Sequence, residues 1–207
     1  MPLSRRETAQ FIVARDPAFA PIVAMIGPPP ARRRARVDER FSHLVRSISH
    51  QLLAIKAAAT IHGRVLELVG GEVTTASVLA LSVDDLRAAG LSRTKAEAML
   101  QLADYVDGGR VRLARHGYMD DHDVVADVTQ VRGIGPWTAQ MYLMFTLARH
   151  DVWPTGDFGV RHGWSVIHGL DENVGEAELE RLGEPFVGAR SAVADYCWAA
   201  VDEVSWQ

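Results

Sequence analysis

The sequence lacks the features that mark several large classes of protein. It contains one cysteine, Cys197, so the chain can form neither an internal disulfide nor a four-cysteine metal cluster. No apolar run approaches the roughly 20 residues that a membrane helix needs. The charged segment Met1–Glu7 has no apolar core behind it, so we expect no signal peptide. These absences predict a cytoplasmic protein with no membrane partner.

An excess of positive charge is also missing. The 22 Lys and Arg residues stand against 26 Asp and Glu residues, which gives a net charge of −4. Domains that bind nucleic acid are usually basic, so the balance argues against such a partner. The charges are nevertheless uneven, because five arginines lie close together in the sequence: Arg32, Arg33, Arg34, Arg36 and Arg40. This arginine cluster is either a solvated loop or a local positive face.

No stretch has a convincing strand pattern, whereas helical spacing recurs along the whole chain. Helices are expected at residues 4–14, 19–26, 38–52, 55–69, 75–81, 83–89, 93–106, 111–116, 136–149, 156–167, 176–182 and 190–204, with one more beginning near residue 123. Asp38, Ser92 and Asp123 are predicted helix caps, and Ser82 with Asp85 forms a capping-box pattern. The fold class is therefore all-α, and loops of two to eight residues fit bundle-like packing. We expect one domain over residues 1–207.

Two segments between residues 131 and 161 carry chemical information. Gly133 and Gly135 lie between two predicted helices, followed by Pro136 at a first helical turn. Two glycines permit a tight turn whose amides form a nest for a phosphate oxygen, although an ordinary turn between helices has the same pattern. Asp157 follows a proline-containing loop, and on local grounds it caps the next helix. The alternative is a carboxylate that acts in chemistry beside a phosphate.

The same part of the chain is rich in large side chains: Trp137, Met141, Tyr142, Phe145, Trp153, Phe158 and Trp164. Core packing explains such a set, and so does a pocket that stacks a planar, cationic ligand. The residues from His116 to Asp123 include types that bind metals. Their spacing fits no zinc or calcium pattern, so we interpret them as a polar loop with a helix cap.

Four blocks in order resemble the helix-hairpin-helix DNA glycosylases, specifically the 3-methyladenine DNA glycosylase II group. They are FSHLVRSISHQLLAIKAAA from Phe41, LRAAGLSRTKA from Leu86, VRGIGPWTA from Val131 and DVWPTGDFGVR from Asp151. The resemblance implies a two-lobed helical fold with the active-site cleft between the lobes, and a hairpin over about residues 123–149. It also implies that alkylated purines such as 3-methyladenine and 7-methylguanine are removed from duplex DNA in base excision repair.

The resemblance assigns roles to individual residues. Asp157 matches the catalytic aspartate, which stabilises the cationic sugar or activates the attacking water. Trp137 and Phe158 match aromatic positions of the base pocket, and Met141 stands where some relatives have another aromatic residue. Gly133, Gly135 and Thr138 belong to the DNA-binding hairpin. The wedge that fills the place of the flipped base falls on Gln51, Leu52 and Leu53.

Cofactors and partners follow from the same resemblance. No cofactor is required, although carbonyl oxygens of Thr129, Val131 and Gly133 match a monovalent-cation site of relatives. Strand-cutting relatives have a lysine where this chain has Trp137, so we expect a monofunctional enzyme. The iron–sulfur branch needs cysteines that are absent here. The expected partner is double-stranded DNA containing alkylated bases, bound by a monomer. A non-catalytic helix-hairpin-helix DNA-binding module is the alternative, which the acidic charge and Met141 favour.

Overall fold

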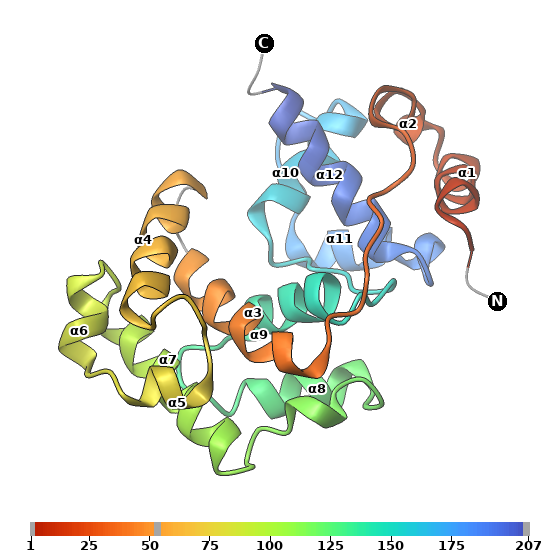
Figure 1. Ribbon diagram of the computed structural model, residues 1–207. Coiled ribbons are helices and arrows are strands. Elements are labelled where there is room, and N and C mark those ends of the chain that lie inside the picture. Colours follow the sequence, from red (N-terminus) through yellow and green to blue (C-terminus); the bar gives the residue numbers. More distant parts are fainter. Residues whose placement is uncertain (1–2, 52–54, 205–207) are drawn as a thin grey trace. The chain divides into compact units, whose positions relative to one another are not determined.

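The computed structural model describes residues 3–51 and 55–204. All regular structure within these ranges is helical, with no strand, so the predicted all-α class is confirmed (Figure 1). The chain forms two compact units. The terminal unit comprises residues 1–32 and 149–207, and the central unit comprises residues 33–148. None of the helices in the described residues is long and apolar enough to cross a membrane.

The central unit is built around α3 and α7. Its elements are α3 (Val37–His50), α4 (Ile55–Leu68), α5 (Thr75–Leu79), α6 (Val83–Ala88), α7 (Arg93–Asp107), η2 (Leu113–Arg115), α8 (Asp121–Val128), α9 (Pro136–Met141) and η3 (Tyr142–Thr146). The predicted apolar stripe of α3 is buried, since Leu44, Val45 and Ile48 are fully inaccessible to solvent. Helices α5 and α6 pack on α7, which also contacts α3.

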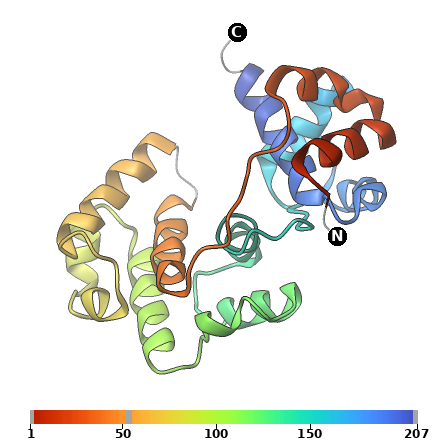
Figure 2. The ribbon, with the colours of Figure 1, turned by 45° about the vertical axis from the view of Figure 1, so that its right-hand side comes forward.

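The terminal unit joins the two ends of the chain. It contains α1 (Arg5–Arg15), η1 (Pro17–Phe19), α2 (Ala20–Ile26), α10 (Phe158–His168), α11 (Glu176–Leu182), η4 (Glu184–Phe186) and α12 (Arg190–Val204). Helices α10 and α12 lie side by side and make the most extensive contact between elements (Figures 1 and 2). Phe19 fills the core beside them, with edge-on contacts to Trp164, Phe186 and Tyr196.

Several helix ends are fixed by local signals that the sequence displays. Ser82 and Asp85 form the predicted capping box, and the Ser92 hydroxyl accepts a hydrogen bond from the Lys95 amide. Gly70 and Gly71 end α4 with φ of 70° and 89°, a backbone region that favours glycine. Two predicted caps are wrong. Arg36, rather than Asp38, caps α3, and Asp120, rather than Asp123, precedes α8.

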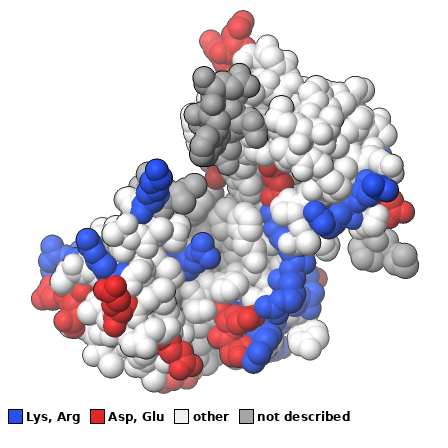
Figure 3. Space-filling model, turned by 45° about the horizontal axis from the view of Figure 1, so that its top comes forward, with Lys and Arg blue, Asp and Glu red and all other residues white. Residues whose placement is uncertain are grey.

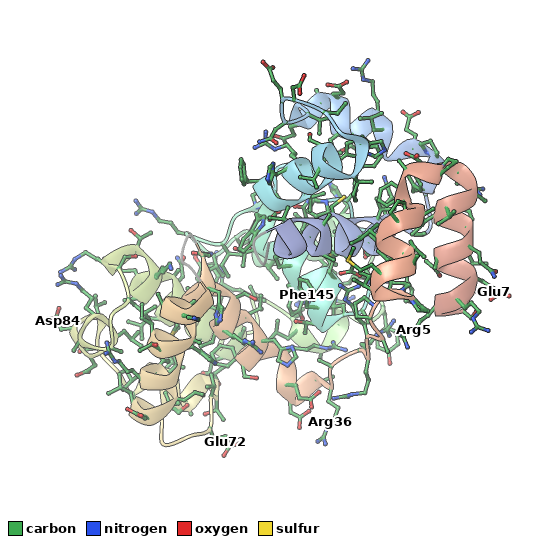
Figure 4. The ribbon with its side chains drawn as sticks, turned by 90° about the horizontal axis from the view of Figure 1, so that it is seen from above. Arg5, Glu7, Arg36, Glu72, Asp84 and Phe145 are labelled. Atoms are coloured by element: carbon green, nitrogen blue, oxygen red, sulfur yellow. The ribbon has the colours of Figure 1, made fainter. Side chains whose placement is uncertain are left out.

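The arginine cluster is only partly a solvated loop, because Arg33, Arg34 and Arg36 are exposed whereas Arg40 is buried. Arg40 is 4% exposed and donates to the carbonyl oxygen of Leu113 at 2.5 Å. Arg32 pairs with Asp195 in the terminal unit, and Arg36 (labelled in Figure 4) pairs with Asp38 at 2.7 Å. On the face shown in Figure 3, basic and acidic side chains lie next to one another. Arg32, Arg36 and Arg40 therefore all have partners within the chain.

The helix expected over residues 136–149 changes form part-way. It is α-helical to Met141, then π-helical from Tyr142 to Thr146, where the Leu147 amide donates to the Tyr142 carbonyl five residues back. Only a 3-10 turn forms within the predicted helix at 111–116. π-Helical turns are rare and often occur beside functional sites.

A buried hydrogen-bonded chain anchors the start of the π-helical turn. His116 is inaccessible to solvent, and its two ring nitrogens lie 3.0 Å from the Tyr142 hydroxyl and 2.7 Å from an Asp127 carboxylate oxygen. Burial lowers the pKa of His116 and raises that of Tyr142. The interpretation of His116 as part of a polar loop is therefore wrong, because the ring is a core group with a partner on each side.

Candidate functional site

Asp157 caps the helix that carries it, as local chemistry predicts. Its Oδ1 accepts a hydrogen bond from the Val160 amide at 2.9 Å, so it satisfies one of the free amides in the first turn of α10. A turn closed by the Asp157 amide and the Pro154 carbonyl, 3.0 Å apart, precedes it. The side chain is half-buried. The carboxylate is therefore held in one orientation at the positive end of a helix dipole.

Trp198 on α12 is a second donor to the same carboxylate. Its indole N–H donates to Asp157 Oδ1 at 2.9 Å. A carboxylate that accepts two hydrogen bonds on one oxygen has little freedom to rotate. The four sequence blocks end at Arg161 and give Trp198 no role, so this contact is a finding of the structure.

Two glycines in α10 explain how Trp198 reaches Asp157. A Cβ on Gly163 would lie 1.9 Å from the Cys197 carbonyl oxygen, and one on Gly159 would lie 2.9 Å from Trp198 Cδ1. No larger residue fits between these backbones without displacing α12. The spacing of Gly159 and Gly163, four residues apart on one helix face, is the sequence signal that predicts such an approach.

Phe158, next to Asp157, presents its ring to solvent. The side chain is 63% exposed, which excludes the core-packing interpretation for this aromatic. One side is covered by His162, whose ring lies 5.7 Å from that of Phe158, centre to centre, and nearly parallel to it. The imidazole in turn contacts Asn173. An exposed aromatic surface therefore adjoins the carboxylate within the terminal unit.

The glycine hairpin lies in the central unit, between α8 and α9. Gly133 has φ of 95°, and a Cβ there would lie 3.0 Å from the Ala98 side chain, so both conformation and space require glycine. Gly135 differs, because it has an extended backbone with φ of −91° and open space around it. It caps α9, and Pro136 follows in the first turn as predicted.

Trp137 and Met141 line one cavity of the central unit, with a volume of about 390 Å³. Its other lining residues are His43, Arg46, Ser47, His50, Phe145 and Thr146. Trp137 is 36% exposed and Phe145, which is labelled in Figure 4, is 49% exposed, whereas Met141 is buried. The π-helical turn brings the consecutive residues Phe145 and Thr146 to the same cavity. Sequence reasoning missed the contribution of α3 to this lining.

His43 is the polar group of this cavity with the clearest structural constraint. Its Nδ1 lies 3.1 Å from the Thr146 hydroxyl, and burial lowers its pKa. The lining contains aromatic rings, hydroxyls, histidines and one arginine, and no carboxylate. Such a cavity suits a planar heterocycle that stacks on the rings and meets donors at its edge.

Gln51 is tied to the hairpin. Its side-chain amide donates to the Gly133 carbonyl at 3.0 Å and to the Thr138 hydroxyl at 2.9 Å. Thr138 is 2% exposed, so this member of the predicted hairpin set is a buried anchor. The other two wedge residues, Leu52 and Leu53, lie outside the described residues.

The carbonyl oxygens predicted to hold a cation already have partners in two of three cases. The Val131 oxygen accepts the Ile134 amide at 3.0 Å, and the Gly133 oxygen accepts the Gln51 side chain. A carbonyl oxygen has two lone pairs, so each retains capacity for a second partner. Within residues 3–51 and 55–204, no group of three or more His, Cys, Asp or Glu side chains is arranged to hold a metal ion.

Comparisons with known proteins agree with this architecture. The model of the HhH-GPD superfamily base excision DNA repair proteins matches residues 45–187, which is more than half of the chain. The chain belongs to this superfamily. DNA-3-methyladenine glycosylase 1 of Schizosaccharomyces pombe is 26% identical over 186 residues, covering 88% of this chain and 82% of that protein. The predicted resemblance to helix-hairpin-helix glycosylases is confirmed.

Two solved HhH-GPD structures match nearly the whole chain. The DNA-3-methyladenine glycosidase of Bacillus halodurans is 31% identical with a TM-score of 0.81, covering 97% of this chain and 91% of that one. The 3-methyladenine DNA glycosylase of Schizosaccharomyces pombe, in complex with abasic DNA, is 25% identical with a TM-score of 0.86. This second match covers 93% of the present chain and 95% of that chain.

The candidate residues of this HhH-GPD protein fall into two groups. Asp157 and Phe158 belong to the terminal unit, together with the newly found Trp198. The hairpin, the aromatic cavity and Gln51 belong to the central unit. Within each unit, residues that are far apart in sequence are brought into direct contact.

Proposed function

We propose that the protein is a monofunctional DNA glycosylase that hydrolyses the N-glycosidic bond of alkylated purines in duplex DNA. The substrates would include 3-methyladenine and 7-methylguanine, and their release would initiate base excision repair. The observation that carries this proposal is the Asp157 carboxylate, oriented by the Val160 amide and the Trp198 indole beside the exposed Phe158. Membership of the HhH-GPD superfamily and the names of the closely similar proteins support it.

The carboxylate would act on a nucleotide that has left the base stack. Breaking the glycosidic bond leaves positive charge on the sugar, and a fixed anion close to that charge stabilises the transition state. Since Val160 and Trp198 donate to Oδ1, the orientation of the carboxylate is set before the substrate arrives. The same group could direct a water molecule to the sugar carbon.

The damaged base would be held by aromatic side chains. Alkylation at a ring nitrogen gives the purine a positive charge, which weakens the glycosidic bond and favours stacking on electron-rich rings. Trp137 in the central unit and Phe158 in the terminal unit expose rings suited to this contact. Met141 adds a polarisable side chain to the cavity.

The DNA strand would be held by the hairpin, and the wedge would fall at Gln51, Leu52 and Leu53. Backbone amides around Gly133 and Gly135 would contact phosphate oxygens. A monovalent cation on the carbonyl oxygens of Thr129, Val131 and Gly133 would neutralise part of the phosphate charge there. We propose that a monomer does this work, on double-stranded DNA.

The experiment is an assay for free bases. Purified protein is incubated with duplex DNA treated with a methylating agent, and the released bases are separated by chromatography. We expect free 3-methyladenine and 7-methylguanine with the sugar–phosphate strand left intact. DNA binding without base release would instead identify a non-catalytic binding module.

Borohydride trapping tests the monofunctional assignment separately. Trp137 occupies the place of the lysine that forms a Schiff base in strand-cutting relatives, and an indole cannot form this bond. We expect no covalent protein–DNA adduct after reduction. A trapped adduct would show that another amine of this chain attacks the sugar.

A further inference from the structure

One face of α7 supports both the hairpin and the end of α3. Ala98 lies against Gly133, and the Gln101 side chain accepts a hydrogen bond from the Arg132 amide at 2.6 Å. Lys95, three residues before Ala98, reaches the end of α3. Residues three positions apart are neighbours on a helix surface, so Lys95, Ala98 and Gln101 form a continuous row along one side of α7. Helix α7 is therefore a common platform for two segments that are about 80 residues apart in sequence.

Lys95 binds the carboxyl end of α3. Its ammonium donates to the carbonyl oxygens of Ser49 at 3.3 Å and Gln51 at 2.5 Å. The last carbonyl groups of a helix have no partners within the helix, and a cation is favourable there because of the helix dipole. The lysine side chain is only partly exposed, and burial lowers its pKa. The partly buried charge is held in this position by its two carbonyl partners.

Gln51 joins three elements. Its main-chain oxygen is bound by Lys95 of α7, and its own amide donates to Gly133 of the hairpin and Thr138 of α9. The backbone of α3 is thus fixed on one side and the side chain on the other. Any displacement of Gln51 relative to the hairpin breaks hydrogen bonds on both sides.

We propose that Lys95 is a positioning residue for base flipping, which holds Gln51 and the end of α3 in register with the hairpin. The proposal rests on the proposed function, since Gln51 lies where the DNA wedge is expected. A hairpin that grips the strand and a wedge that enters the stack must keep a fixed separation while the base is displaced. Lys95 maintains this separation from α7 without contacting DNA itself.

The test compares Lys95→Met with Lys95→Arg. Methionine keeps the apolar stem and removes the ammonium, whereas arginine keeps a donor cation of similar reach. Two duplexes carry 7-methylguanine, one opposite cytosine and the other opposite a mismatched base. Flipping costs a few kcal/mol from a stable pair and less from a mismatch. Arg93→Met is the matched control, because Arg93 is an exposed cation on the same helix, paired with Glu97 at 3.7 Å.

We expect Lys95→Met to reduce single-turnover base release from the paired duplex about tenfold or more and from the mismatched duplex by less than about threefold. Lys95→Arg should recover most of the loss, and Arg93→Met should match the wild type. Equal losses on both duplexes would show that Lys95 supports the fold or general DNA binding only, and no loss on either would also overturn the proposal.

A flipping signal separates this inference from the proposed function. The fluorescence of 2-aminopurine in the duplex rises when the base leaves the stack. We expect a rise with wild-type protein that falls by about half or more with Lys95→Met at saturating protein. If wild-type protein released no base, the proposed function would fail, and this signal would still decide the role of Lys95. An equal rise with both proteins would contradict the inference.

Discussion

At the scale of single residues, the candidate site depends on contacts that fix rotation. Asp157 is held by one local bond, to Val160, and one distant bond, to Trp198 on another helix. A carboxylate used for electrostatic stabilisation must keep its orientation, because the interaction energy depends on where the charge lies relative to the developing cation. The residue that orients Asp157 is therefore as informative about function as Asp157 itself.

Trp198→Phe should separate orientation from packing. An aromatic ring remains and the N–H donor is lost, so we expect single-turnover base release to fall about tenfold, which corresponds to roughly 1.4 kcal/mol. Trp153→Phe is the control, because the Trp153 indole donates to the Leu179 carbonyl instead. That variant should lose about 1 kcal/mol of stability and keep its rate. Equal rates for both variants would show that the Trp198 bond does not orient the catalytic group.

At the scale of elements, close packing brings the site residues together. The α10–α12 contact depends on Gly159 and Gly163, and the hairpin depends on Gly133 against Ala98. At each of these positions, a side chain larger than hydrogen would meet a neighbouring atom at 3.0 Å or less. These contacts are the places where one added methyl group should have the largest effect.

Gly163→Ala should destabilise the fold by about 2–4 kcal/mol, because the new Cβ would lie 1.9 Å from a backbone oxygen. Gly63→Ala should instead stabilise the fold. Gly63 lies within α4 with open space around it, and alanine is favoured over glycine in a helix by about 0.5–1 kcal/mol. Thermal unfolding measures both. A neutral Gly163→Ala would contradict the close approach of α10 and α12.

The central unit should lose stability in mild acid. Burial lowers the pKa of His43, His62 and His116 below the ordinary value of 6.5. Near and below pH 6.5 the unfolded chain therefore binds more protons at these histidines than the folded unit does. Their contribution to stability is complete above that pH and decreases as the pH falls. The midpoint of thermal unfolding between pH 8 and pH 5 measures this. His122→Gln is the control, because the His122 side chain is 93% exposed. This variant should leave the dependence of the unfolding midpoint on pH unchanged. A midpoint that rises as the pH falls would contradict the account.

At the scale of the whole molecule, local chemistry predicts the helices and long-range contacts decide the site. The two ends of α11, the start of α12 and the caps at Ser82, Ser92 and Asp157 follow from nearby residues, and the structure has them as predicted. The burial of Arg40, the His116 chain and the Trp198 bond could not be predicted in this way. Their partners lie 11 to 73 residues away, and no local pattern specifies which distant group a side chain will meet.

The resemblance to a known family supplied what local patterns could not. Asp157 alone is an ordinary helix cap, and only the ordered blocks around it indicate chemistry. The structure then adds the hydrogen bond from Trp198 to Asp157 and the contacts of α7 beneath the hairpin, which the blocks alone do not specify. The central claim remains that the charge of this one carboxylate drives base release.

Asp157→Asn tests that claim most directly. The amide oxygen can still accept from Val160 and Trp198, so the fold should persist while the charge is removed. We expect single-turnover release of 3-methyladenine from methylated duplex DNA to fall at least about 100-fold, with duplex affinity within about threefold of the wild type. Asp120→Asn, at the N-terminus of α8, is the matched control and should keep full activity. Wild-type release by Asp157→Asn would contradict the account.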